Sequence, residues 1–139
     1  MSREAALAQA NAVPTTLARG RVEKSIRTFL STYAAKDVET RGALFGDQVV
    51  FEDPVGAEPI RGKDRLLAFF DATVGSGWDI AMESEKIIKS GNEALSVTKA
   101  QWGLAGTEPA RLTLIQHFAF DDAGKIVSLR IFFDEATIS

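Results

Sequence analysis

The chain has 139 residues, 45% of them hydrophobic, and a formal net charge of −3, which suits one globular domain with a sizeable core. The absence of cysteine excludes disulfides, thiolate zinc sites and cysteine nucleophiles, and the single histidine, His117, excludes a multi-histidine metal site. The acidic balance offers no basic patch for nucleic acid, and we find neither a membrane-spanning apolar run nor a secretory leader, so we expect a soluble, cytoplasmic protein.

The N-terminal part is expected to be an extension followed by a helix. We assign residues 1–20 to the extension, because Pro14 interrupts a helix there, and residues 21–137 to one domain. Apolar residues then recur at helical spacing, which predicts an amphipathic helix over about 16–36. Its apolar positions are Val22, Ile26, Phe29, Leu30 and Tyr33. Asp37 can cap a second, short helix that ends near Phe45.

The next element is a strand that ends at Asp53. The run from Val49 to Pro54 is rich in β-branched and aromatic residues and closes with a proline. Alternation along a strand places Val49, Phe51 and Asp53 on one face and Glu52 on the other. A carboxylate on an apolar face lies either at the rim of the core or in a pocket, where burial raises its pKa and makes it a usable base. The alternative is that Asp-Pro simply starts a turn.

A third helix and four more strands complete the pattern. The helix is predicted over 64–74, and the strands over about 79–89, 93–104, 110–121 and 125–135. Three helices followed by a mostly antiparallel sheet predict an α+β domain with the helices on one face of the sheet. The opposite face has more apolar surface than a solvated sheet needs, which indicates a homodimer through that face. Its apolar residues are Ile115, Ile126 and Phe132.

Two further residues stand out on the apolar strand faces. Gln116 lies between Leu114 and Phe118, and a buried amide without partners costs about 1–3 kcal/mol. It is either a core amide bonded to the backbone or a group that points into the same cavity as Asp53. In the second case a proton acceptor and a donor face each other across a space suited to a hydrophobic ligand. Trp102 is either core or the wall of that space.

The segment Glu52-Asp53-Pro54-Val55-Gly56 resembles the base-bearing segment of bacterial ketosteroid isomerases. The similarity extends to Ile60-Arg61-Gly62 and Gln116-His117-Phe118 and covers about residues 22–135. The wider family consists of cone-shaped domains similar to nuclear transport factor 2, often called SnoaL-like. The resemblance implies a cystatin-like cone, in which a curved, mainly antiparallel sheet wraps around three helices and encloses a deep pocket.

The resemblance also implies roles for single residues. Asp53 falls on the general base that shuttles a proton beside a carbonyl, and Gln116 falls on the acidic group of the oxyanion hole. The tyrosine donor of the family falls on Phe29, which cannot donate a hydrogen bond. Tyr33, one turn further along, either packs or supplies the missing hydroxyl. The remaining pocket positions implied by the resemblance are Phe70, Trp102, Phe118 and Phe133.

These observations favour an enzyme that transfers a proton on a small hydrophobic carbonyl substrate, steroid-like or polyketide-like, with Asp53 as base and Gln116 as polariser. No metal or cofactor is expected, because phosphate-cradling and dinucleotide motifs are absent. Three alternatives remain open. The same pocket could serve a cyclase, dehydratase or epoxide hydrolase. It could also be a binding domain without catalysis, or a scaffold like the transport factors.

Overall fold

The computed structural model describes residues 1–139, with four helices and one six-stranded sheet. The helices are α1 (Arg3–Asn11), α2 (Arg19–Ala35), α3 (Val38–Ala43) and α4 (Lys63–Gly75). The strands are β1 (Phe45–Glu52), β2 (Ile60–Arg61), β3 (Trp78–Ser90), β4 (Glu93–Leu104), β5 (Ala110–Phe120) and β6 (Ile126–Phe132), and a short 3-10 helix spans Glu135–Thr137. None of the helices is both long and apolar enough to cross a membrane.

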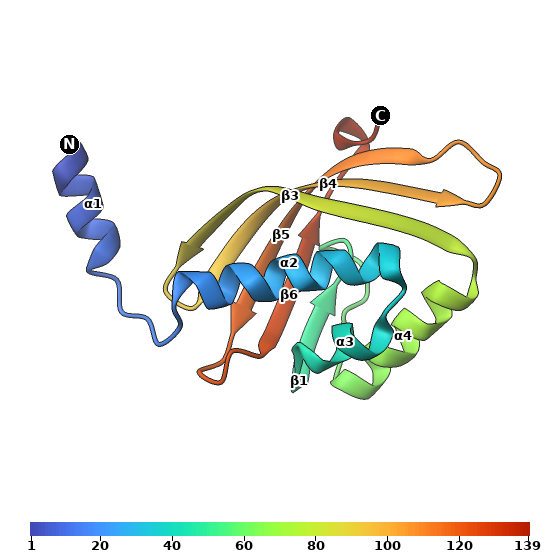
Figure 1. The fold of residues 1–139 in the computed structure, drawn as a ribbon, viewed down its shortest axis with the longest axis horizontal. Helices are drawn as coiled ribbons and strands as arrows, with labels where there is room; N and C mark the ends of the chain where they lie inside the picture. The colour runs from blue at the N-terminus through green and yellow to red at the C-terminus, as the bar shows by residue number, and fades with distance from the viewer.

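The sheet has the strand order β2-β1-β6-β5-β4-β3, and every neighbouring pair is antiparallel except β1 and β6. It curves around α2, α3 and α4, which lie on its concave side (Figure 1). The predicted α+β cone with a mainly antiparallel sheet is therefore confirmed, and β1 and β6 are its one parallel pair. The inner face of β5 follows the predicted alternation. Its buried residues are Leu112, Leu114, Gln116, Phe118 and Phe120.

The cap predicted at Asp37 is present. The Asp37 carboxylate accepts hydrogen bonds from the Thr40 backbone N–H at 3.0 Å and from the Thr40 hydroxyl at 2.6 Å. These bonds satisfy one of the free N–H groups at the start of α3. They also fix the turn between α2 and α3, which brings α3 under the C-terminal end of α2.

The prediction for the N-terminal extension was wrong in one respect. Residues Arg3–Asn11 form α1, because this helix ends before Pro14 and the proline does not interrupt it. All residues of α1 are exposed, and the helix projects from the body at the end opposite α4 (Figure 1). The packed body begins at Thr15, whose hydroxyl donates to Asn92 Oδ1 at 2.6 Å, and Leu17 is already buried.

One residue of the predicted outer apolar face lies elsewhere. Ile126 is fully buried, because the pairing of β5 and β6 shifts register between Ala119 and Phe120 and breaks the alternation there. Ile115 and Phe132 remain on the outer face, 36% and 41% exposed, and are paired across β5 and β6. A homodimer through this face stays a prediction.

Candidate active site

A cavity of about 530 Å³ opens between α2, α4 and the concave face of the sheet. Ten of its 13 lining residues are hydrophobic. Such a lining suits a ligand that is mostly apolar and is oriented by a few polar groups. Trp78, which is 41% exposed, marks the rim of the cavity. The apolar lining consists mainly of Phe69, Phe70, Ala72, Trp78, Ile80, Met82, Leu114 and Ile131.

Asp53 lines this cavity directly after the end of β1. Val49 and Phe51, four and two residues earlier on the same face, are buried in the core, so the alternation of β1 carries Asp53 inward. Glu52 points the other way and accepts a hydrogen bond from Arg130 Nε at 2.7 Å. The chain beyond Asp53 is held by the Val55 N–H, which donates to the Ile131 carbonyl at 2.8 Å. Anchors on both sides therefore fix the backbone that carries Asp53.

The environment of Asp53 disfavours its charged form. Burial raises the pKa of Asp53 to about 6. None of the four ion pairs of the structure involves this residue, so no cation offsets the loss of hydration. A carboxylate with such a pKa is still ionised at neutral pH and is a stronger base than an exposed aspartate.

This shift predicts a pH-dependent gain in stability for Asp53→Asn. An unfolded aspartate titrates near 4, so between about pH 4 and 6 the folded protein retains a proton that the unfolded chain has released. Stability therefore falls as pH rises through this window and stays lower above it. Asparagine lacks this penalty, and we expect Asp53→Asn to be more stable than the wild type at pH 8, by at most about 2–3 kcal/mol, and equally stable near pH 3.5.

Urea unfolding at both pH values measures this difference. The control is Asp47→Asn, which removes an exposed carboxylate from the same strand and is expected to change stability by less than about 0.5 kcal/mol. A gain for Asp53→Asn of equal size at both pH values would show that the Asp53 carboxylate is not desolvated in the folded protein.

Tyr33, on the last turns of α2, brings a hydroxyl group to the same cavity. Burial raises the pKa of Tyr33, the Arg41 guanidinium opposes this rise, and the Asp53 carboxylate adds to it. The Tyr33 hydroxyl is therefore neutral at physiological pH and lies within electrostatic reach of Asp53. It is a hydrogen-bond donor in the same cavity as a base.

The other polar groups of the cavity differ in their availability. The Thr73 hydroxyl donates to the Phe69 carbonyl at 3.0 Å and the Ser76 hydroxyl to the Thr73 carbonyl at 2.8 Å, so both are used within α4. Trp102 Nε1 is buried without a hydrogen-bond partner, and its ring meets Phe133 edge-to-face at 5.5 Å. A buried N–H group without a partner is rare and is a candidate for bonding to a ligand.

Gln116 is fully buried but is not among the residues that line the cavity. Its side-chain carbonyl accepts a hydrogen bond from the Thr98 hydroxyl at 2.7 Å. Its amide N–H group faces Met82 Sδ at 3.8 Å, and Met82 is itself a lining residue. The structure therefore does not bring Gln116 and Asp53 together as the sequence predicted. β5 holds the amide one layer deeper, where the Thr98 hydroxyl satisfies its carbonyl oxygen.

The aromatic residues predicted for the pocket divide into two groups. Tyr33, Phe70 and Trp102 line the cavity. Phe29 and Phe118 are fully buried in the core below it and pack against each other with ring centroids 5.8 Å apart. Phe133 reaches the site only through Trp102.

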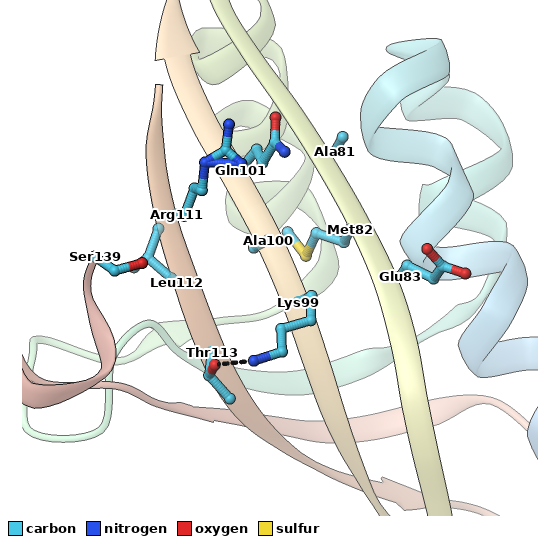
Figure 2. A pocket seen from close by; sticks show the side chains of 10 residues that line it. All are labelled: Ala81, Met82, Glu83, Lys99, Ala100, Gln101, Arg111, Leu112, Thr113 and Ser139. Carbon is cyan, nitrogen blue, oxygen red and sulfur yellow. Dashed lines mark hydrogen bonds between the residues drawn. The ribbon is translucent and has the colours of Figure 1, made fainter. Parts of the chain in front are cut away.

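A second depression, of about 510 Å³, lies over β3, β4 and β5 (Figure 2). Its polar side chains belong to the outward alternation of these strands, and Lys99 reaches across it to donate to the Thr113 hydroxyl at 2.8 Å. Glu83, Lys99 and Arg111 are all exposed. This groove has the character of a solvated sheet surface, and the apolar cavity around Asp53 is the stronger candidate site.

Comparison with known proteins places this chain in a family. The family model for the SnoaL-like domain matches residues 26–129, so the chain belongs to the SnoaL-like family. The chain is also similar to the steroid Delta-isomerase of Nocardioides simplex, with 26% identity over 111 residues, which cover 80% of this chain and 88% of that enzyme.

Solved structures share the whole architecture. A computationally designed 17-OHP binder superposes with a TM-score of 0.77 at 22% identity and covers 86% of this chain and 97% of its own. An epoxide hydrolase of Mycobacterium tuberculosis, described as LEH-like, has a TM-score of 0.76 at 23% identity and covers 85% of this chain and 86% of its own. At these identities the likeness shows the fold alone.

Proposed function

We propose that the chain is an enzyme that transfers a proton between carbon atoms of a hydrophobic carbonyl compound, with Asp53 as the general base. The observation that carries this proposal is a carboxylate without an ionic partner, of raised pKa, in an otherwise apolar cavity. The similarity to a steroid Delta-isomerase supports the reaction class and a steroid-sized substrate. A cavity of about 530 Å³ is within the range of small-molecule sites.

The chemistry requires no group beyond the side chains of the cavity. The Asp53 carboxylate accepts a proton from the carbon next to the carbonyl, and the electron pair of that C–H bond moves toward the carbonyl oxygen to form an enolate. The Tyr33 hydroxyl donates a hydrogen bond to this oxygen as its charge grows. Asp53, now neutral, returns the proton to another carbon of the conjugated system, so a double bond has moved and the enzyme is regenerated.

In this proposal Tyr33 takes the role of donor that the sequence suggested for Gln116. A donor must lie within hydrogen-bond reach of the oxygen where charge develops. Tyr33 lines the cavity, whereas Gln116 is separated from it by the Met82 side chain that it contacts. The free Trp102 N–H group is suited to an acceptor atom elsewhere on the ligand.

Hydrolysis of an epoxide is a second candidate, favoured by the structural likeness to an epoxide hydrolase. There Asp53 would take a proton from a water molecule that attacks the epoxide carbon. The two reactions differ in whether water adds to the substrate. Proton transfer by Asp53 moves a hydrogen and a double bond within the substrate, and hydrolysis places solvent oxygen in a diol.

Isotope labelling separates the candidates. The protein is incubated with a 3-oxo-Δ5 steroid, smaller β,γ-unsaturated ketones and a set of apolar epoxides, in deuterium oxide and in oxygen-18 water, and products are analysed by mass spectrometry against protein-free controls. We expect a shifted double bond from the ketones with no addition of water, and products formed in deuterium oxide that retain the substrate hydrogen, because Asp53 returns the proton that it removes. If the epoxides give labelled diols and the ketones stay unchanged, the protein is an epoxide hydrolase and the proton-transfer proposal is wrong. If the protein binds these compounds tightly and converts none of them, it is a binding protein and the catalytic proposal is wrong.

A further inference from the structure

Arg41 is a buried cation beside the cavity, and the roles proposed above do not use it. Its side chain belongs to α3 and is only 1% exposed. The guanidinium carbon lies 3.8 Å from the centroid of the Tyr33 ring and 4.5 Å from that of the Phe70 ring. Both rings line the cavity. Arg41 is therefore stacked directly behind the wall that carries the Tyr33 hydroxyl.

The surroundings of Arg41 hold it in place, and the carboxylate that acts on it electrostatically is that of Asp37 at the start of α3, with which it forms no ion pair. Its Nε donates to the Thr32 hydroxyl at 3.0 Å, and Nη2 donates to the Thr32 carbonyl at 3.2 Å. It takes part in none of the four ion pairs of the structure. Burial lowers the pKa of Arg41, but a guanidinium stays protonated in proteins. The aromatic faces supply the attraction that compensates part of its lost hydration.

We propose that Arg41 is a positioning residue that acts through Tyr33, drawing electron density from the stacked phenol and making its hydroxyl a stronger donor toward a substrate oxygen that becomes negative. This inference rests on the proposed function for the role of Tyr33, whereas the contact between Arg41 and Tyr33 does not depend on it. A nearby cation lowers the free energy of any arrangement in which negative charge collects on the phenol oxygen or on its hydrogen-bond partner.

The arrangement of charges around Tyr33 supports this role. The cation of Arg41 lies against the ring and the anion of Asp53 acts on it from the cavity, and the two have opposite effects on the acidity of the hydroxyl. When Asp53 accepts the substrate proton, its negative charge is lost and that of Arg41 remains. The field at Tyr33 then favours an enolate oxygen. The same field selects ligands with an acidic or enolisable oxygen over cationic amines.

The test uses the fact that Tyr33 is the only tyrosine of the chain. Incorporation of a fluorinated, more acidic tyrosine labels this position alone, and ¹⁹F NMR then follows its ionisation in the folded protein without any substrate. We expect Arg41→Met to raise the ionisation midpoint of the fluorinated Tyr33 by about one to two pKa units. Arg41→Lys keeps the charge and should raise this midpoint by less than half as much. A midpoint in Arg41→Met within about 0.3 units of the wild type would overturn the proposal.

A second measurement needs only the wild-type side chain at position 41. In the fluorotyrosine protein the ¹H–¹⁵N resonance of Arg41 Nε is expected to move with the same midpoint as the fluorine signal of Tyr33. An Arg41 resonance that stays constant through the ionisation of Tyr33 would overturn the contact. This readout holds even if a buried methionine at position 41 prevents folding.

Activity separates this inference from the function on which it rests. We expect Arg41→Met to lower kcat roughly tenfold in the wild-type background and to have no further effect in Tyr33→Phe, because Arg41 acts through the missing hydroxyl. An equal loss in both backgrounds would overturn the inference and leave Asp53 catalysis intact. Failure of the proposed function would appear instead as full turnover in Asp53→Asn, and failure of the donor role of Tyr33 as full turnover in Tyr33→Phe. In both cases the Arg41-dependent shift of the Tyr33 midpoint would be unchanged.

Discussion

Asp53→Asn is expected to lower kcat/KM by roughly 10³-fold on whichever ketone of the labelling panel the wild type converts fastest. General-base catalysis contributes about 10²–10⁴-fold, and asparagine is isosteric with aspartate but cannot accept the proton. The cavity keeps its shape and its donor, so substrate binding should change little and the loss should lie in kcat. Steady-state kinetics of purified wild type and variant at pH 7.5 measure both parameters.

Asp47→Asn is the matched control for this prediction, because it makes the same change on the same strand at an exposed position. It should retain activity within about twofold. Equal turnover by wild type and Asp53→Asn would remove Asp53 from the mechanism. The combination of lower activity and higher stability at pH 8 in Asp53→Asn would identify the carboxylate as a group kept for function at the expense of the fold.

Tyr33→Phe is expected to lower kcat by about 10²–10³-fold, the usual loss for one oxyanion donor and equivalent to about 2.7–4 kcal/mol. The substitution removes a single oxygen, and the ring contacts with Phe29 at 5.3 Å and with Phe70 at 6.4 Å can persist. KM should change much less than kcat, because the bond to the hydroxyl strengthens as the oxygen becomes negative. Single-turnover kinetics with saturating enzyme isolate the chemical step.

Ser31→Ala is the control for the loss of a hydroxyl on α2. Ser31 is exposed, and its hydroxyl donates to the Thr28 carbonyl at 2.7 Å on the outer side of the helix. Its activity should be within about twofold of the wild type. If Tyr33→Phe were fully active and Gln116→Leu inactive, the donor would be the amide predicted from the sequence, and the cavity would have to reach past Met82.

The position of Asp53 could be predicted because it follows from a local rule. Strand alternation from Val49 through Phe51 needs no knowledge of the rest of the fold, and the structure has both residues buried and Asp53 in the cavity. The cap at Asp37 is equally local. Apart from α1 and the two-residue strand β2, the helices and strands were predicted to within about four residues for the same reason, since each depends on periodicity and turn residues within one segment.

Whether the remaining site residues reach the cavity depends on distances between segments, which strand alternation does not specify. Gln116 does face inward, but whether an inward side chain reaches the cavity or stops in the core depends on its neighbours, here Thr98 and Met82. Phe29 and Tyr33 lie on nearly the same face of α2, and only the later one reaches the open space. Nothing in the sequence indicated that Arg41 is buried beside the cavity, because a charged residue on a short helix is normally exposed.

The unusual basicity of Asp53 is the property on which the account depends most, and it can be measured without a substrate. Carboxyl ¹³C resonances of aspartate-labelled protein are followed by NMR from pH 3 to 8, and the Asp53 resonance is assigned by its absence in Asp53→Asn. We expect a midpoint near 6, in accordance with the burial of this carboxyl. A midpoint below about 4.5, as for an exposed aspartate, would show that water solvates the group and would contradict its assignment as the catalytic base.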